Sequence, residues 1–160
     1  MTGETFPALL WALLLQDFPE SLVLTLFVFS LLNLRLQDKR VLYVALLQTV
    51  TNLVRLLPIA FGIHTVVLTI SLVVYTRLFT GVRLSRTFAA VLACLIIVLG
   101  IEMILYPPLL KLTGLNYETM FANPFIRAAF TLPYEMILLL LALVKNYYNH
   151  KKGLLVGFSR

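Results

Sequence analysis

The sequence predicts an all-α membrane protein with about five transmembrane helices, preceded by a short interfacial or re-entrant helix. Of its 160 residues, 61% are hydrophobic and only 12% are charged. The apolar residues form several runs of roughly 17–25, which is long enough to cross a bilayer. The alternating pattern of barrel strands is absent, and a lipid-facing backbone must satisfy its own hydrogen bonds. Because the runs cover the whole chain, residues 1–160 are expected to form a single transmembrane domain.

The expected spans follow one another from the N-terminus: Asp17–Leu34, Arg40–Ile59, Ile63–Thr80, Arg86–Tyr106 and Ile126–Val144. Before the first, Phe6–Gln16 is apolar but too short to cross alone, and Pro7 suits a helix start. Asp17 and Glu20 have the spacing of a capping box. This pattern favours a short helix, a break near Pro19 and then the span itself. A single long kinked helix is the alternative.

The charges between the spans predict an orientation. The net charge is +6, and the basic residues form short clusters, as topology signals do, rather than a nucleic-acid-binding surface. Nine of them fall in connections on one side: Arg35, Lys39, Arg40, Arg77, Arg83, Arg86, Lys145, Lys151 and Lys152. The opposite connections carry few, with only Lys111 and Glu118 in the Pro107–Pro124 loop. Glu4 is the only charge at an N-terminus that does not resemble a signal peptide. We therefore expect a multi-pass protein of the cell membrane, its N-terminus outside and its C-terminus cytoplasmic.

Three charged residues inside apolar runs are the first candidates for a functional site. Arg55, Glu102 and Glu135 would each cost about 2.5 kcal/mol or more in hydrocarbon, so such groups usually face a bundle interior or a cavity. At about 1.5 Å per residue, Arg55 and Glu102 reach the outer third of the membrane and Glu135 lies nearer its middle. His64 begins the third span at the same outer side.

Helical spacing then gives these residues polar neighbours. Gln48, Asn52 and Arg55 form one stripe on the second span, and Arg127 and Glu135 lie with Thr131 on one face of the fifth. We therefore expect an outward-facing polar pocket lined by six residues: Asn52, Arg55, His64, Glu102, Arg127 and Glu135. Two alternatives remain open. Arg55 and Glu102 could form only a structural ion pair, and a local hydrogen bond could satisfy Glu135.

The sequence gives no positive sign of catalysis. Cys94 is the only cysteine, which excludes disulfide frameworks, paired-cysteine redox motifs and cysteine-rich zinc sites. HExxH, GxSxG and glycine-rich phosphate-loop motifs are all absent. We therefore expect no enzyme activity, no metal and no cofactor. The pairs Ala89–Ala93 and Ala90–Cys94 allow close helix approach, so a homo-oligomer or a membrane partner subunit is expected.

The layout resembles the membrane sensor region of AgrC-type and related GHKL histidine kinases of Gram-positive bacteria. The resemblance lies in several short spans, the stretch Val54–Thr65, and the basic, tyrosine-rich exit Lys145-Asn146-Tyr147-Tyr148. It implies ligand sensing at the membrane and signalling to a cytoplasmic partner. After Lys152 only Gly153–Arg160 follow, without a phosphoacceptor or ATPase domain. The resemblance would then imply a free-standing sensor or a kinase without its catalytic half.

Three functions remain open from the sequence. The first is a sensor-like or regulatory module that binds a peptide or small amphiphile in the outward pocket and signals through the fifth span. The second is a small transporter or substrate-capture subunit, in which Glu102 and Glu135 titrate or contact the substrate. The third is an oligomeric structural or assembly protein that associates through the fourth span.

Overall fold

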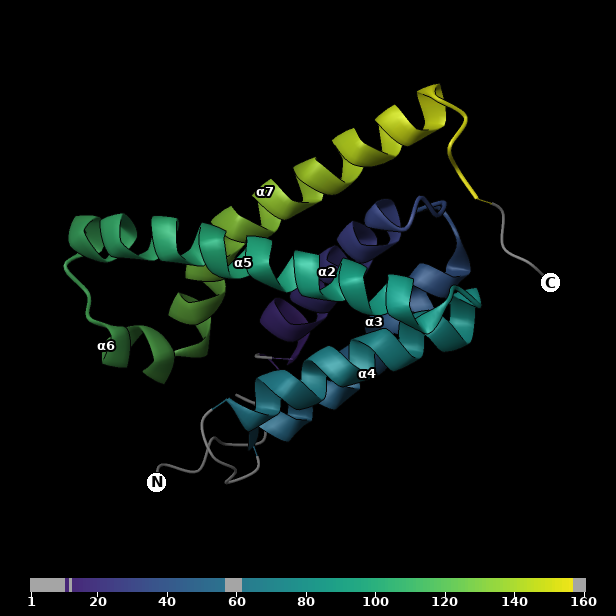
Figure 1. The fold of residues 1–160 in the computed structure, drawn as a ribbon. Helices are drawn as coiled ribbons and strands as arrows, with labels where there is room; N and C mark the ends of the chain where they lie inside the picture. Colours follow the sequence, from purple (N-terminus) through teal and green to yellow (C-terminus); the bar gives the residue numbers. More distant parts are fainter. Residues whose placement is uncertain (1–10, 12, 57–61, 157–160) are drawn as a thin grey trace.

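The structure, a computed structural model, describes residues 11, 13–56 and 62–156 and is built from helices (Figure 1). The elements are, in order, η1 (Leu13–Asp17, a π-helix), α2 (Phe18–Leu31), α3 (Lys39–Thr51), η2 (Asn52–Leu56, a 3-10 helix), α4 (Ile63–Thr80), α5 (Leu84–Thr113), α6 (Tyr117–Ala122) and α7 (Pro124–Lys151). The only extended pairing within these ranges is an isolated bridge between Leu34 and Val156. The all-α prediction is confirmed.

Four helical stretches in the described part of the chain are long and apolar enough to cross a membrane: Leu14–Leu31, Ile63–Thr80, Leu84–Thr113 and Phe125–Lys151. They confirm a helical membrane protein and correspond to four of the five expected spans.

The second expected span, Arg40–Ile59, has a shorter α-helix than expected, because α3 has 13 residues and passes into the five-residue η2. At rises of about 1.5 and 2.0 Å per residue the two together cover about 30 Å. Residues 57–61 lie outside the described ranges.

The start of the first span differs from the expected capping box and helix break. Asp17 has helical backbone angles (φ −66°, ψ −35°) and its side chain caps nothing, so the expected capping box is wrong. Leu13–Leu31 form one continuous helical stretch whose first turn is a π-helix. Pro19 has no N–H to donate, and at the first turn of α2 this loss does not break the helix. Most of the expected short helix Phe6–Gln16 lies outside the described residues.

α2 is the central helix of the bundle and packs against α3, α5 and α7. Half of the first span's apolar window is buried inside the protein, compared with 22% for α4 and for α5. The core residues come from five helices: Val23, Phe27, Val28, Phe29, Val44, Leu72, Val73, Val91, Cys94, Tyr134, Leu138 and Ala142. The remaining apolar faces of α4, α5 and α7 are exposed and suit contact with lipid.

Both ends of α5 and α7 extend past the expected spans. α5 continues through Pro107 and Pro108 to Thr113 and ends at Gly114, whose φ of +68° lies in the left-handed region. The expectation of a loop beginning at Pro107 is therefore wrong. The remaining loop contains α6, which packs against the start of α7. A small second core joins these segments through three buried residues, Leu110, Met120 and Phe130.

α2 ends in a Schellman motif that uses asparagine in place of the usual glycine. Asn33 has a φ of +60°. The N–H of Leu34 donates to the carbonyl of Phe29 (2.9 Å), and that of Asn33 donates to the carbonyl of Ser30 (3.2 Å). These bonds satisfy carbonyls that the end of a helix otherwise leaves without partners. The helix therefore ends three residues before the expected boundary at Leu34.

α7 ends in the same way, and the two ends are bonded together. The N–H of Leu154 donates to the carbonyl of Asn149 (2.9 Å), next to Gly153 with its φ of +64°. The Nδ2 of Asn149 then donates to the carbonyl of Ser30 (2.9 Å). Beyond both helices, the N–H of Val156 donates to the carbonyl of Asn33 (2.9 Å). We call these two hydrogen bonds between the helix ends the α2–α7 joint.

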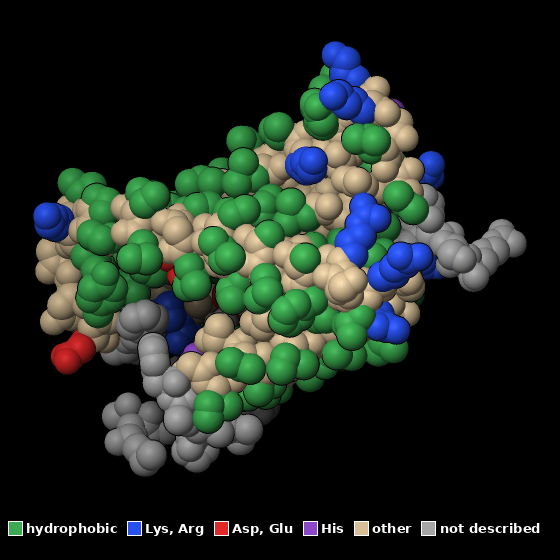
Figure 2. All heavy atoms as spheres, in the orientation of Figure 1, with side chains coloured by type: hydrophobic (Ala, Val, Ile, Leu, Met, Phe, Trp, Pro, Cys, Tyr) green, Lys and Arg blue, Asp and Glu red, His purple; other side chains and the backbone are tan. Residues whose placement is uncertain are grey.

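The basic residues gather at the end of the molecule that contains this joint. Figure 2 shows Lys and Arg side chains where α7 ends and where α4 turns into α5. The α2–α3 connection, with Arg35, Lys39 and Arg40, lies at this end as well (Figure 1). The three connections that the sequence groups on one side of the membrane are therefore together in space.

Candidate functional site

A cavity of about 190 Å³ lies among α2, α3 with η2, α4 and α5. We call it the bundle pocket. Its lining consists of Glu20, Leu24, Gln48, Asn52, Thr65, Leu68, Thr69, Leu72, Val91, Cys94, Leu95, Val98, Leu99 and Glu102. Pockets that bind drug-sized ligands typically have volumes of about 300–1,000 Å³. The bundle pocket therefore fits a small ligand, or one segment of a longer one.

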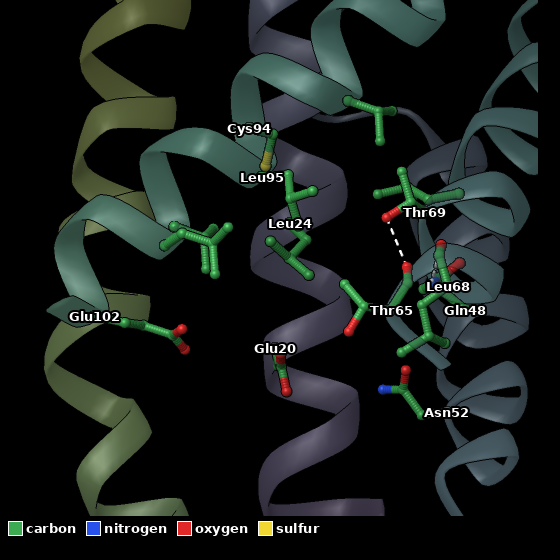
Figure 3. A pocket seen from close by; sticks show the side chains of 14 residues that line it. Glu20, Leu24, Gln48, Asn52, Thr65, Leu68, Thr69, Cys94, Leu95 and Glu102 are labelled. Carbon is green, nitrogen blue, oxygen red and sulfur yellow. Dashed lines mark hydrogen bonds between the residues drawn. The ribbon is translucent and has the colours of Figure 1, made fainter. Parts of the chain in front are cut away.

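The bundle pocket is polar at one end and apolar at the other. Figure 3 shows Glu102 and Asn52 directed toward its interior from opposite sides, with Glu20 between them and Cys94 and Leu95 at the far end. Figure 2 shows a hollow beside α5 with acidic and basic side chains inside it. Along α5 the lining runs from Val91 to Glu102, a rise of about 16 Å. A ligand with a polar head and an apolar tail matches this gradient.

Two buried side-chain amides at the wall of the bundle pocket join α3 and η2 to α4 and α2. Gln48 Nε2 donates to the carbonyl of Leu68 (3.0 Å), and Gln48 Oε1 accepts from Ser71 Oγ (3.0 Å). Asn52 Nδ2 donates to Ser21 Oγ at 3.3 Å. Hydrogen bonds of this kind between membrane helices contribute about 0.6 kcal/mol on average. The polar stripe predicted on the second span therefore holds α3 and η2 against α4 and α2, in addition to bordering the pocket.

The structure brings part of the predicted site together. Asn52 and Glu102 both line the bundle pocket. Arg55 lies in η2, three residues beyond Asn52, but its side chain is outside the description, so its pairing with Glu102 stays a prediction. His64 is the second residue of α4 and precedes the lining residue Thr65.

Arg127 and Glu135 are on α7, which contributes no residue to the lining of the bundle pocket. Arg127 Nε donates to Gln16 Oε1 at 2.5 Å, joining the start of α7 to η1. This contact gives Arg127 a structural role at the end of the bundle. Of the six residues expected in one pocket, Asn52 and Glu102 therefore line the bundle pocket, and Arg127 and Glu135 lie outside its lining.

Glu135 is buried inside the bundle, with only 5% of its surface exposed. Thr131 lies one turn earlier on α7, but its hydroxyl donates to the backbone carbonyl of Ala128 (2.9 Å). Oε1 of Glu135 has no hydrogen-bond partner among the described residues. The local hydrogen bond that the sequence left open therefore does not satisfy the whole carboxylate.

Glu135 belongs to an acidic interior region formed by three helices. Glu20 on α2, Glu102 on α5 and Glu135 on α7 all lie near the phenol of Tyr134. Tyr106 Oη donates a hydrogen bond of 3.1 Å to Glu102 Oε1. Carboxylate oxygens in their ionised form accept hydrogen bonds and donate none. This region therefore favours a ligand group that donates hydrogen bonds or carries positive charge.

Sequence reasoning missed Glu20, which was assigned to a capping box. Glu20 is the one acid in α2, and the residues after it in this helix are apolar except for Ser21, Thr25 and Ser30. That pattern could have placed it inside the membrane. Sequence reasoning also missed Tyr106, which it placed only as the last residue of the fourth expected span. In the structure Tyr106 lies one turn after Glu102, a spacing at which helical side chains meet.

Comparison of the chain with protein-family models, curated proteins and solved structures finds no match. The site must therefore be interpreted from its own geometry.

Proposed function

We propose that this protein is a membrane-embedded, sensor-like binding module. Its ligand is a small amphiphile whose amine or other donor-rich head lies between Glu20 and Glu102. The apolar tail lies along Leu72, Val91 and Leu95. The observation that carries this proposal is the gradient of the bundle pocket, in which carboxylates from two helices form one end and apolar side chains form the other.

The packing of α2 supports a signalling role for this binding. Glu20 and Leu24 of α2 line the bundle pocket, and the far end of the same helix is bonded to α7 through Ser30 and Asn149. A ligand that displaces α2 would therefore act on the end of α7 and the segment after it. We propose that this end faces the cytoplasm, with the N-terminus outside, because the basic residues gather there.

The resemblance to AgrC-type sensor regions implies the same class of function, ligand sensing at the membrane. Such a module would act on a separate cytoplasmic partner through the end of α7. The binding of a whole peptide is less well supported, because the bundle pocket has a volume of only about 190 Å³. Of the ligand classes expected from the sequence, a small amphiphile therefore fits better.

Binding is tested with the full chain in lipid nanodiscs and three probes of equal tail length: decylamine, decanol and decyl sulfate. We expect saturable binding by calorimetry, with decylamine at least tenfold tighter than decyl sulfate. Glu102→Gln should weaken decylamine binding at least fivefold. Glu118→Gln, an exposed acid on α6, is the matched control and should change it less than twofold. Equal affinity for the three probes, or an unchanged Glu102→Gln variant, would refute the proposed site.

A small transporter is the second candidate, favoured by the irregular helices near the acidic region. The π-helix η1, the 3-10 helix η2 and Pro133 within α7 make three passes locally irregular without breaking α7 or the Leu13–Leu31 stretch, and irregular helices often accompany substrate sites in transporters. Proteoliposomes loaded with a pH-sensitive dye distinguish the two functions. Proton flux coupled to decylamine uptake would favour transport, and saturable binding without flux would favour sensing.

A further inference from the structure

A second cavity, of about 530 Å³, lies at the basic end of the molecule. It is bounded by the α2–α3 connection on one side and the end of α7 on the other, beside the α2–α7 joint. We call it the basic-end cavity. Its lining includes Arg35, Leu36, Asp38, Asn146, His150 and Leu155. None of these residues lines the bundle pocket.

The walls of the basic-end cavity offer donors suited to phosphate. Arg35 forms no ion pair with a described residue, and its planar guanidinium matches the geometry of phosphate oxygens. His150 lies across the cavity, on the last turn of α7. The one carboxylate in the lining, that of Asp38, is already engaged at the start of α3. It accepts from the N–H of Arg40 (2.9 Å) and lies 3.9 Å from Arg40 Nε.

The same cavity also contains a hydrogen-bond acceptor. Asn146 Oδ1 is buried and has no hydrogen-bond partner among the described residues. A buried polar group without a partner costs about 1–3 kcal/mol, so a bound hydroxyl that donates to this oxygen would be stabilised. The cavity thus combines two hydrogen-bond donors for a phosphate, Arg35 and His150, with an acceptor for a hydroxyl.

The surroundings of this cavity have the composition of a membrane interface. Tyr147 and Tyr148 are exposed on the last turns of α7. The Nζ atoms of Lys145 and Lys152 lie 5.7 and 4.6 Å from the centroid of the Tyr148 ring. Tyrosines and lysines mark the level of lipid headgroups, where basic pockets between helices bind anionic lipids.

We propose that the basic-end cavity binds the headgroup of an anionic phospholipid that carries both a phosphate and free hydroxyls, as phosphatidylglycerol does. Arg35 and His150 hold the phosphate, and Asn146 accepts from a headgroup hydroxyl. A lipid in this position contacts the α2–α3 connection and α7 at once, and therefore stabilises the α2–α7 joint. This inference is independent of the ligand of the bundle pocket.

The proposal is tested by the thermal stability of the full chain in detergent micelles with increasing phosphatidylglycerol. We expect a saturable rise in the melting temperature. In the double variant Arg35→Gln, His150→Gln, the lipid concentration for half of this rise should increase at least fivefold. Lys111→Gln removes one basic charge at the opposite end of the molecule and should change it less than twofold. An unchanged double variant would overturn the proposal.

The source of the phosphate is decided by three further additions. Phosphatidylcholine with the same acyl chains and millimolar inorganic phosphate should each give less than a fifth of the rise. An equal rise with either would overturn the assignment to an anionic lipid. Should the double variant not fold, Asn146→Ala gives an independent measurement by native mass spectrometry. It should lower the preference for phosphatidylglycerol over phosphatidic acid at least threefold, and an unaltered preference would overturn the role of the hydroxyl.

Discussion

Asn149 Nδ2 donates a 2.9 Å hydrogen bond to the backbone carbonyl of Ser30, and both residues have 0% of their surface exposed. The two residues are 119 positions apart in the sequence. Each belongs to the last turns of a helix, so this bond joins the ends of α2 and α7. It is a side-chain bond at the basic end that connects the first described span to the last.

Replacing Asn149 should therefore weaken the whole bundle. Asn149→Ala removes this bond, while the carbonyl of Ser30 keeps the N–H of Asn33 as a donor. We therefore expect a loss of about 0.5–1.5 kcal/mol in the free energy of unfolding. The measurement is unfolding by sodium dodecyl sulfate in mixed micelles. Lys151→Ala, an exposed residue on the last turn of α7, is the matched control and should change the free energy of unfolding by less than about 0.5 kcal/mol. A loss below about 0.5 kcal/mol for Asn149→Ala would contradict the importance of the joint.

Glu135→Gln should stabilise the protein. The substitution keeps the shape of the side chain but removes a buried charge whose Oε1 has no partner among the described residues. Burial of a charge is more costly than burial of a neutral amide. We expect a gain of about 1 kcal/mol in unfolding free energy at pH 8, with a change below about 0.5 kcal/mol for the exposed Glu118→Gln. A destabilised Glu135→Gln variant would indicate that the carboxylate has a cationic partner.

Cys94 should react slowly with thiol reagents and more slowly still when the bundle pocket is filled. Only 1% of its surface is exposed, and it lines the apolar end of that pocket. We expect alkylation by N-ethylmaleimide at least tenfold slower than for Leu112→Cys in a Cys94→Ser background, because Leu112 is 84% exposed. Saturating decylamine should slow only the Cys94 reaction. An equal effect on both thiols would argue against ligand in the pocket.

The proposed orientation predicts which ends react from outside the cell. In a Cys94→Ser background, a membrane-impermeant maleimide should label Glu118→Cys in intact cells. Lys151→Cys should be labelled only after the cells are opened. Both residues are exposed and lie near opposite ends of the bundle, so the pair is internally controlled. The reverse pattern would place the N-terminus in the cytoplasm.

The helical spans could be predicted from the sequence because length and apolar composition determine them. α4 occupies Ile63–Thr80, as expected, because Gly62 and Gly81 bound it on both sides. The prolines were less informative. Pro19 and Pro107 each predicted a boundary, yet both lie within continuous helical stretches, since neighbouring packing accommodates a missing hydrogen bond.

For the candidate site, helical rise gives the height of each residue along its helix, but it does not give the neighbouring helix that the side chain faces. A rise of about 1.5 Å per residue placed Arg55 and Glu102 at one level, and Asn52, from the same polar stripe as Arg55, does share the bundle pocket with Glu102. The packing order of the helices decides which residues meet, and it depends on contacts distant in the sequence. Arg127 and Glu135 were therefore grouped with the pocket, although α7 packs on the other side of α2.

α5 has 30 residues, so it is about 45 Å long. That exceeds a hydrocarbon layer of about 30 Å, and such a helix must tilt or project beyond the lipid. Its last turns carry Leu110, which packs with Met120 and Phe130, so any change of tilt moves this small core with it. The conformation of the loop end should consequently depend on bilayer thickness. Lipids of different acyl-chain length would then alter how open the molecule is at that face.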